Sequence, residues 1–191
     1  MDRILRGERI SLEILPPLPV YVEALRTVVQ RNRDHLDEWR GDVIKYEESE
    51  AAFYKLLMDN YYYERGDGYF YHIMKKGEII GHIGLVFSGK VWEISYWLDK
   101  DYTSQGYMCE ALKTLERAWF QHSTDALTIY VNAKNESSLN VVKKMNYIPF
   151  GINRYLKNFT IFMNEDKINI HSTCIVPAQK KIELDETQLH R

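Results

Sequence analysis

The chain has 191 residues, of which 45% are hydrophobic and 27% are charged, with 25 basic against 27 acidic side chains. This composition is typical of one globular domain and excludes a largely disordered chain. The formal net charge of -2 provides no basic excess to attract nucleic acid or an anionic membrane surface, so neither is expected as a partner.

The cysteines and the N-terminus indicate where the protein works. Cys109 and Cys174 form no CxxC pair, which is typical of free thiols in a cytoplasmic protein. Residues 1–9 are charged and lack the apolar core of a signal peptide, and no apolar run approaches the roughly 20 residues that span a bilayer. We therefore expect a soluble cytoplasmic protein.

The first half of the chain predicts one strand, then helices, then strands. Residues 10–14 alternate between apolar and polar side chains, which indicates a first strand. Helical periodicity predicts three helices, over residues 20–29, 34–39 and 47–63. The expected buried stripe of the third helix is Ala52, Tyr54, Leu57 and Met58. Turn residues between apolar runs predict three antiparallel strands, over residues 69–74, 79–87 and 91–98.

The second half changes character at the polar loop of residues 99–106. A helix is expected over residues 107–121, with one apolar face made by Met108, Ala111, Leu112, Leu115, Ala118 and Trp119. The remaining predicted elements are a fifth strand at 127–132, a helix at 135–146 with Asn135 or Ser137 as its N-cap, and strands at 149–163 and 168–176. This order predicts an α+β fold with a mixed, mostly antiparallel sheet of seven strands. We expect a single domain over residues 1–178 and a polar tail over 179–191.

The loop between the fourth strand and its following helix is the best candidate for a ligand site. The first turn of a helix has N–H groups without intrahelical partners and a partial positive charge, so it can bind an anion without a basic side chain. Gly106 would let the backbone approach a phosphate closely. Taken alone, one glycine between a strand and a helix is more often only a connection, and no Walker loop or GxGxxG is present.

Several patterns occur in order around this loop. Residues 93–98 read EISYWL, Gly106-Tyr107 precede Glu110-Ala111-Leu112, residues 135–138 read NESS, and residues 142–147 read VKKMNY. Residues 32–36 read NRDHL and are followed by Trp39. The series, over about residues 8–176, resembles GNAT acetyltransferases, in the branch of the RimJ/RimL-type ribosomal-protein N-terminal acetyltransferases. That branch reads E-(I/L)-G-Y-W-(I/L), G-Y-x-x-E-A-L, N-x-x-S, v-x-K-x-G-F and N-R-x-H-L…W at these places.

The resemblance implies a GNAT fold whose sheet splays between its fourth and fifth strands. It implies acetyl-CoA as cosubstrate, no metal, and an amine acceptor that attacks directly in a ternary complex. The acceptor would be a protein N-terminal α-amine or a small-molecule amine, read by residues 20–69 and by the last strands, and a homodimer is common in the branch. The implied cofactor-binding residues are Trp97, Leu98, Thr103, Ser104, Gln105, Gly106, Tyr107, Met108, Asn135 and Ser138.

Two residues are catalytic candidates. Glu93 would act as a base, directly or through water, although a solvated strand residue is nearly as good an interpretation. Ser138 would donate a proton to the departing thiolate, or would only hydrogen-bond the first turn of its helix. The tyrosine that acts as general acid in many GNAT enzymes would fall at Val142 and is absent.

The loop also departs from the family, which commonly has Gln or Arg where Thr103 stands and Gly or Ala where Met108 stands. Thr103 could still offer its N–H and hydroxyl, whereas the bulk of Met108 could reduce affinity for CoA. These departures leave open a second hypothesis, a CoA-binding or interaction module with little or no turnover.

The remaining polar residues carry plainer interpretations. Glu110 is expected to be structural, and Cys109 a packed thiol without a base beside it. The histidines lack metal-binding spacing, and His72 and His82 are interpreted as ordinary sheet residues rather than as part of the acceptor cleft. The tyrosines expected in the core and the cleft wall are Tyr61, Tyr62, Tyr63, Tyr69 and Tyr71.

Overall fold

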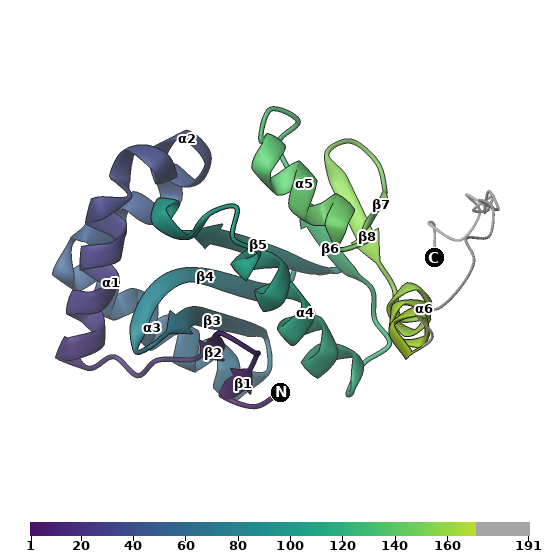
Figure 1. Ribbon diagram of the computed structural model, residues 1–191. Coiled ribbons are helices and arrows are strands. Elements are labelled where there is room, and N and C mark those ends of the chain that lie inside the picture. The colour runs from purple at the N-terminus through teal and green to yellow at the C-terminus, as the bar shows by residue number, and fades with distance from the viewer. Residues whose placement is uncertain (171–191) are drawn as a thin grey trace.

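A computed structural model describes residues 1–170, with side chains through residue 164. Its centre is an eight-stranded sheet in the order β1-β2-β3-β4-β5-β6-β8-β7 (Figure 1). The strands are β1 (Ile4–Arg6), β2 (Ser11–Glu13), β3 (Gly68–Lys75), β4 (Glu78–Phe87), β5 (Trp92–Leu98), β6 (Leu127–Tyr130), β7 (Ile148–Pro149) and β8 (Arg154–Lys157). Only β5 and β6 pair in parallel. The predicted α+β class with a mixed, mostly antiparallel sheet is confirmed, with eight strands rather than seven.

Helices cover both faces of this sheet (Figure 1). The α-helices are α1 (Pro19–Arg31), α2 (Arg33–Ile44), α3 (Ser49–Arg65), α4 (Tyr107–Phe120), α5 (Glu136–Lys144) and α6 (Phe159–Ile170), with short 3-10 helices η1 (Lys45–Glu47) and η2 (Lys100–Tyr102). Helix α4 packs on one face, whereas α1, α2 and α3 share a second hydrophobic cluster with Met74, Ile79 and Trp97 of the sheet. Side chains of a strand alternate between faces, so neighbouring residues of β5 contribute to different layers.

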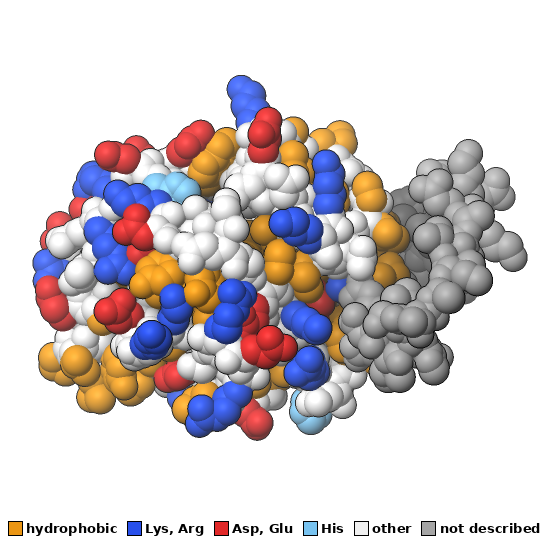
Figure 2. All heavy atoms as spheres, viewed as in Figure 1, with side chains coloured by type: hydrophobic (Ala, Val, Ile, Leu, Met, Phe, Trp, Pro, Cys, Tyr) orange, Lys and Arg blue, Asp and Glu red, His pale blue; other side chains and the backbone are white. Residues whose placement is uncertain are grey.

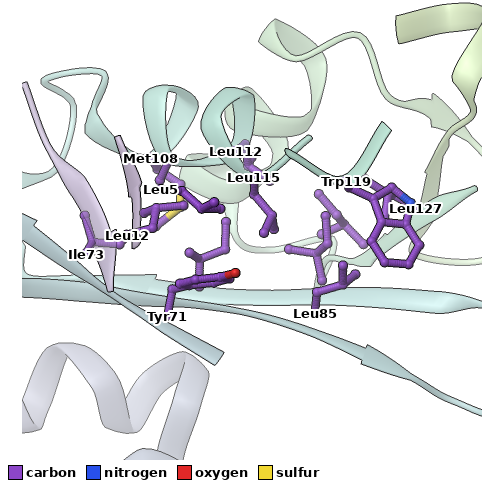
Figure 3. Close-up of a cluster of buried hydrophobic side chains, with 14 of the residues drawn as sticks. Leu5, Leu12, Tyr71, Ile73, Leu85, Met108, Leu112, Leu115, Trp119 and Leu127 are labelled. Carbon is purple, nitrogen blue, oxygen red and sulfur yellow. The ribbon is translucent and has the colours of Figure 1, made fainter. Parts of the chain in front are cut away.

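The larger core lies between α4 and the sheet. Figure 3 shows Leu112, Leu115 and Trp119 of α4 pointing toward Tyr71 and Leu85 on the strands. Each fully buried leucine of this kind contributes about 1.5–3 kcal/mol relative to an exposed one. The apolar face predicted for this helix is confirmed, except that Ala118 is only partly buried while Phe120 is added to the core.

The stripe predicted for α3 is wrong in all but Ala52. The buried residues of this helix are Ala52, Leu56 and Asp59, whereas Tyr54, Leu57 and Met58 are exposed. Apolar side chains occur on both faces of α3, so periodicity could not identify the face that meets the sheet.

The strand predicted over residues 149–163 is confirmed only in part, as β7 and β8, and the strand predicted over 168–176 is wrong at residues 168–170, which belong to α6. A short β7–β8 hairpin turns at Gly151 and Asn153, both with positive φ, and α6 begins at Phe159. The Asn158 side chain accepts from the Ile161 N–H, and Phe159 and Phe162 pack on Phe120. Capping and aromatic packing thus override a β-rich local sequence. Residues 171–176 and the predicted tail at 179–191 lie outside the described residues.

Candidate active site

The site lies where β5 and β6 separate. Their parallel register pairs Trp92 with Leu127, Glu93 with Thr128 and Ile94 with Ile129, and no pair follows. Within residues 1–170, β5 continues beyond Ile94 to Leu98 with β4 as its only partner strand. The splay expected between the fourth and fifth predicted strands is therefore present, and it leaves backbone groups of residues 95–98 free on the side facing β6.

A cleft of about 780 Å³ opens at this splay. Its walls are α2, β5, the loop before α4 with the first turn of that helix, β6, and α5. The candidate residues that line it are Glu93, Trp97, Leu98, Thr103, Ser104, Gly106, Tyr107, Met108, Asn135 and Ser138. Gln105 is the one candidate that does not. The structure thus gathers residues up to 45 positions apart along one cavity.

The N-terminus of α4 opens into the cleft. Gly106 is its N-cap residue with φ +83°, and the first helical hydrogen bond runs from the Glu110 N–H to the Gly106 carbonyl at 3.0 Å. Within residues 1–170 the amides of residues 104–109 donate to no backbone carbonyl. A row of free N–H groups at the positive end of a helix is suited to an anion.

The loop backbone is held in an unusual conformation. Ser104 has φ +59°, in the left-handed region that residues other than glycine rarely adopt, two positions before Gly106. Such a conformation costs roughly 1–2 kcal/mol and persists only where the surroundings enforce it. The Arg9 guanidinium is part of those surroundings, because its Nη1 donates to the Gln105 carbonyl at 3.2 Å.

Thr103 and Gln105 support the loop more than they face a ligand. Both the N–H and the hydroxyl of Thr103 donate to the Lys100 carbonyl, at 3.3 and 2.8 Å. The Gln105 side-chain amide donates to the Asp101 carbonyl at 2.7 Å. The expectation that Thr103 offers these two donors to CoA is therefore corrected, because both already close η2.

Met108 does not obstruct the cleft as its size suggested. Its side chain is only 6% exposed and packs in the core beside Leu5 and Leu12 (Figure 3). The bulk of the residue thus lies beneath the loop and leaves its backbone at the cleft.

Glu110 is structural, as expected. Its carboxylate accepts from the Arg9 N–H at 2.6 Å, from Arg9 Nε at 2.7 Å and from the Ile10 N–H at 3.3 Å. Burial by itself would raise the pKa of Glu110, but the Arg9 amide and guanidinium outweigh it and lower that pKa. The ion pair joins the first turn of α4 to the β1–β2 connection.

Asp99 is a second anchor of the loop that no sequence pattern indicated. Asp99 is fully buried, and its carboxylate accepts from Arg31 Nε at 2.6 Å and from the Asp101 N–H at 3.1 Å. The Asn32 side-chain carbonyl accepts from the Lys100 N–H at 2.8 Å. These bonds fix the loop to the end of α1. Only the fold brings together partners 68 residues apart.

Glu93 and Ser138 lie on opposite sides of the splay. Alternation along β5 places Glu93 and Trp97 on the face covered by α1–α3, since Trp97 packs in that cluster. Ser138 stands in the first turn of α5, where its N–H donates to the Asn135 side chain at 3.0 Å. Asn135 is therefore the N-cap, one of the two residues predicted for it.

Tyr96 is a cleft residue that no sequence pattern indicated. Tyr96 lines the cleft on the α4 side of β5 and packs against the larger core. Burial raises the pKa of its hydroxyl to about 12, and the nearby Ser138 side chain offsets this only in part. The alternation of the EISYWL segment is the signal that could have separated Tyr96 from Glu93.

The other residues weighed from the sequence lie mostly outside the cleft. Cys109 is half-buried at its edge, and burial raises the pKa of the thiol. His72 and His82 are buried in β3 and β4 without lining the cleft. None of the five tyrosines expected at the cleft wall lines it, and Tyr61 is 51% exposed. That part of the expectation is wrong, whereas Tyr71 is in the core as predicted.

The described residues offer neither a metal site nor a helix that could span a membrane. No group of three or more His, Cys, Asp or Glu side chains in this part of the chain is arranged to hold a metal ion. Among the helices of residues 1–170, none has the length and apolar character needed to cross a membrane.

Comparisons with known proteins point in the same direction. A family model described as an acetyltransferase (GNAT) domain matches residues 14–147. The search of curated proteins gave no match. Among solved structures, a RimL ribosomal L7/L12 α-N-protein acetyltransferase in complex with coenzyme A superimposes with a TM-score of 0.73 at 19% identity, over 83% of this chain and 99% of that one.

Two further structures share the fold. A ribosomal-protein-S5-alanine acetyltransferase from Vibrio fischeri has a TM-score of 0.67 at 17% identity, over 81% of this chain and 94% of its own. The microcin C7 self-immunity acetyltransferase MccE, in complex with acetyl-CoA and AMP, also has a TM-score of 0.67 at 17% identity, over 80% and 93%.

Proposed function

Because this chain belongs to the acetyltransferase (GNAT) domain family, we propose that it transfers an acetyl group from acetyl-CoA to an amine by direct attack in a ternary complex. One observation carries the proposal. The free amides at the start of α4 face a cleft that exists because β5 and β6 part beyond Ile94. An anion site and a slot between strands therefore adjoin, which suits a cosubstrate with a diphosphate at one end and a thioester at the other.

The surroundings of the loop favour a polyanionic ligand. Arg9 lies beside it, since a Cβ built on Gly106 would lie 3.5 Å from Arg9 Nη2. Figure 2 shows Lys and Arg side chains gathered over the region of α4, whose exposed residues include Lys113 and Arg117. The cavity volume falls within the roughly 300–1,000 Å³ usual for ligand pockets.

We assign roles to the residues of the slot from the chemistry that the transfer requires. Backbone groups of Trp97 and Leu98 would hold the thioester carbonyl and the pantetheine arm, because β5 has no partner on that side. Asn135 would contact the pantetheine arm with the amide protons that its capping bond leaves free. Glu93 would accept the proton that the amine loses, and Ser138 would assist departure of the sulfur from the opposite face.

The acceptor is proposed as an amine that enters between α2 and β5. Glu38 of α2 lines that side of the cleft together with Glu93, which favours a group that arrives as an ammonium ion, whereas Asp42 is paired with Arg40. The structurally similar proteins include enzymes named for ribosomal protein N-termini and one for microcin C7 immunity. Both a protein N-terminal α-amine and a small-molecule amine are retained as acceptor classes.

We propose the following domain boundaries, cellular location and partners. One domain spans residues 1–178, with residues 179–191 as a tail, and the enzyme works in the cytoplasm as a monomer or homodimer without nucleic acid. Light scattering on the full chain determines the oligomeric state. A mobility-shift assay at low salt, in which no nucleic acid should be retarded, tests the last point.

The deciding experiment is calorimetry with CoA beside a thiol-release assay with acetyl-CoA and a panel of amines. The panel contains peptides with free N-termini, polyamines, amino acids and aminoglycosides. We expect CoA to bind and at least one amine to release thiol. Binding without release on any amine would favour the alternative, a CoA-binding module, and absence of binding would end both.

A further inference from the structure

The Tyr96 hydroxyl is a buried polar group without a partner. It is shielded from solvent and makes no hydrogen bond of ordinary geometry within the described residues, although Ser138 lies near enough to influence its pKa. Removing a hydroxyl from water without a compensating hydrogen bond is unfavourable, so native proteins rarely leave one unpaired. A phenylalanine would fill the same space without this cost. The hydroxyl therefore calls for an explanation outside the stability of the fold.

The location of the Tyr96 hydroxyl indicates which group would be its hydrogen-bond partner. Tyr96 lines the cleft, with Ser138 of α5 and Cys109 of α4 both close enough to influence its hydroxyl. Both neighbours also line the cleft, between the anion-binding start of α4 and the splay of β5 from β6. On the proposed function, this is the stretch along which the pantetheine arm runs to its sulfur.

The strand separates this hydroxyl from the candidate base. Glu93 and Tyr96 are three residues apart on β5, and an odd separation places two side chains on opposite faces of a strand. Tyr96 packs with the α4 core, whereas Trp97, on the face of Glu93, packs with the α1–α3 cluster. An amine that attacks from the Glu93 side would thus expel the thiolate toward Tyr96.

We propose that the Tyr96 hydroxyl donates a hydrogen bond to the CoA sulfur as the thioester bond breaks, a role that rests on the proposed function. In that step the amine nitrogen forms a bond to the carbonyl carbon and the carbon–sulfur bond breaks with its electron pair on sulfur. The proton lost by the amine passes to Glu93. Tyr96 keeps its own proton, and the thiolate takes one from water after departure, so the overall reaction yields an amide and CoA thiol.

The residue at the position of the family's general-acid tyrosine cannot donate a hydrogen bond to the sulfur. Val142, on α5, is fully buried in the core and has no proton to share. A thiolate whose conjugate thiol has an ordinary pKa of about 8.5 is too weak a base to deprotonate a buried phenol, so hydrogen bonding is favoured over full proton transfer. The raised pKa of Tyr96 keeps the hydroxyl protonated throughout the working range.

The test measures the pKa of the thiol of bound CoA. The ultraviolet absorbance of the thiolate is followed as the CoA complex of the full chain is titrated with base, with the complex of desulfo-CoA as blank so that Cys109 cancels. A hydrogen bond to the thiolate should lower the pKa of bound CoA in the wild type relative to Tyr96→Phe by about 1–2 units. The variant should also lower kcat about 10- to 100-fold, with the Kd for CoA within about threefold.

Stability separates this role from a structural one. Tyr96→Phe removes an unsatisfied hydroxyl, so its Tm should stay the same or rise by about 2–4 °C. The matched control is Tyr63→Phe, since Tyr63 packs against the same core but donates to the Met1 carbonyl at 3.1 Å, on α3 and away from the cleft. This control should retain the kcat and the CoA titration of the wild type.

The outcomes are distinguishable. If wild type and Tyr96→Phe bind CoA and titrate alike, the inference is wrong while the proposed function stands. A fall in Tm with an unshifted titration would make Tyr96 structural and would equally overturn it. If the wild type does not bind CoA at all, the proposed function fails, and the inference fails with it.

Discussion

Gly106 meets two demands at once. Its φ of +83° lies in the region that favours glycine, and its missing side chain leaves the start of α4 open toward the cleft. A Cβ there would meet only Arg9 Nη2, at an ordinary contact distance of 3.5 Å. Substitution should therefore disturb ligand binding more than folding.

Gly106→Asp should weaken CoA binding about 100-fold, because it places a carboxylate where the diphosphate is expected. The matched control is Gly106→Asn, which has the same shape, tolerates a positive φ and lacks the charge. Isothermal titration with CoA measures both variants, and a thermal melt verifies that both are folded. Equal CoA affinity for Gly106→Asp and the wild type would refute the assignment of the loop.

Ser138→Ala should lower kcat about 10- to 100-fold and change the Kd for CoA by less than about threefold. The reason is that a hydroxyl beside the leaving sulfur acts mainly in the transition state. Thiol release and CoA titration on the same preparations give the two numbers. An equal loss in both would make Ser138 a binding residue only.

At the scale of the element, α4 is held in place by bonds at its first turn. Glu110 accepts from two backbone amides and one guanidinium of the β1–β2 connection. These bonds fix the helix start that is proposed to bind the diphosphate. The end of α5 departs from the family pattern. Asn146, with φ +55°, stands there in place of glycine.

The end of α5 is a Schellman motif. The Tyr147 N–H donates to the Val142 carbonyl at 3.0 Å and the Asn146 N–H to the Lys143 carbonyl at 3.1 Å. Asparagine is the residue that best replaces glycine in this conformation. The departure at Asn146 is therefore explained without any loss of the site.

Glu110→Ala should lower the free energy of unfolding by about 1–3 kcal/mol, because it leaves two backbone amides and the Arg9 guanidinium without their acceptor. Glu110→Gln keeps one acceptor oxygen and should lose about half as much. Urea unfolding of the three proteins measures the difference. A Glu110→Ala protein as stable as the wild type, yet inactive, would instead make Glu110 catalytic.

At the scale of the whole molecule, a group of ionisable side chains is buried on the face of the sheet opposite α4. Lys55 Nζ lies 2.5 Å from the Asp59 carboxylate and 3.2 Å from His82 Nε2, and the His72 ring is 5.4 Å from that of His82. Burial, with Lys55, lowers the pKa of His72 to about 3 and that of His82 well below its usual value. The Glu13 backbone opposes the shift of His72 but completes no hydrogen bond of ordinary geometry.

These shifts make stability depend on pH. A histidine whose pKa is lower in the folded protein binds its proton mainly in the unfolded chain, so its contribution is present above pH 6.5 and is lost as the pH falls. Asp59 acts in the opposite direction, since burial raises its pKa to about 6 against the pull of Lys55. Because two histidines outweigh one carboxyl, the protein should lose stability as the pH falls between roughly pH 6 and 4.

His72→Leu removes one of the two buried histidines, so it should nearly flatten that dependence. Urea unfolding at pH 7.5, 6, 5 and 4 gives the slope for each protein. His122→Gln, an exposed substitution, is the control and should keep the wild-type slope. A slope unchanged in His72→Leu would mean that other groups carry the acid sensitivity.

Local sequence by itself determined much of this protein. The apolar face of α4, the hairpin turn before Glu78, and the order of strands and helices over residues 10–146 follow from periodicity and from turn residues, which act over a few positions. Gly106 and the polar loop around it could be proposed as an anion site for the same reason. Resemblance to a family then added the CoA slot that no local pattern could specify.

Tertiary structure decided the rest, because the deciding contacts join distant residues. The buried side of α3, the helix at Phe159 and the anchoring of Asp99 by Arg31 depend on which surfaces meet. The side-chain directions of Met108 and Tyr96 were decided in the same way, by the packing of α4 on β1 and β2 and by the core that β5 faces. A residue type indicates what a side chain can do, but only the packed fold determines which face it occupies and whether it has a partner.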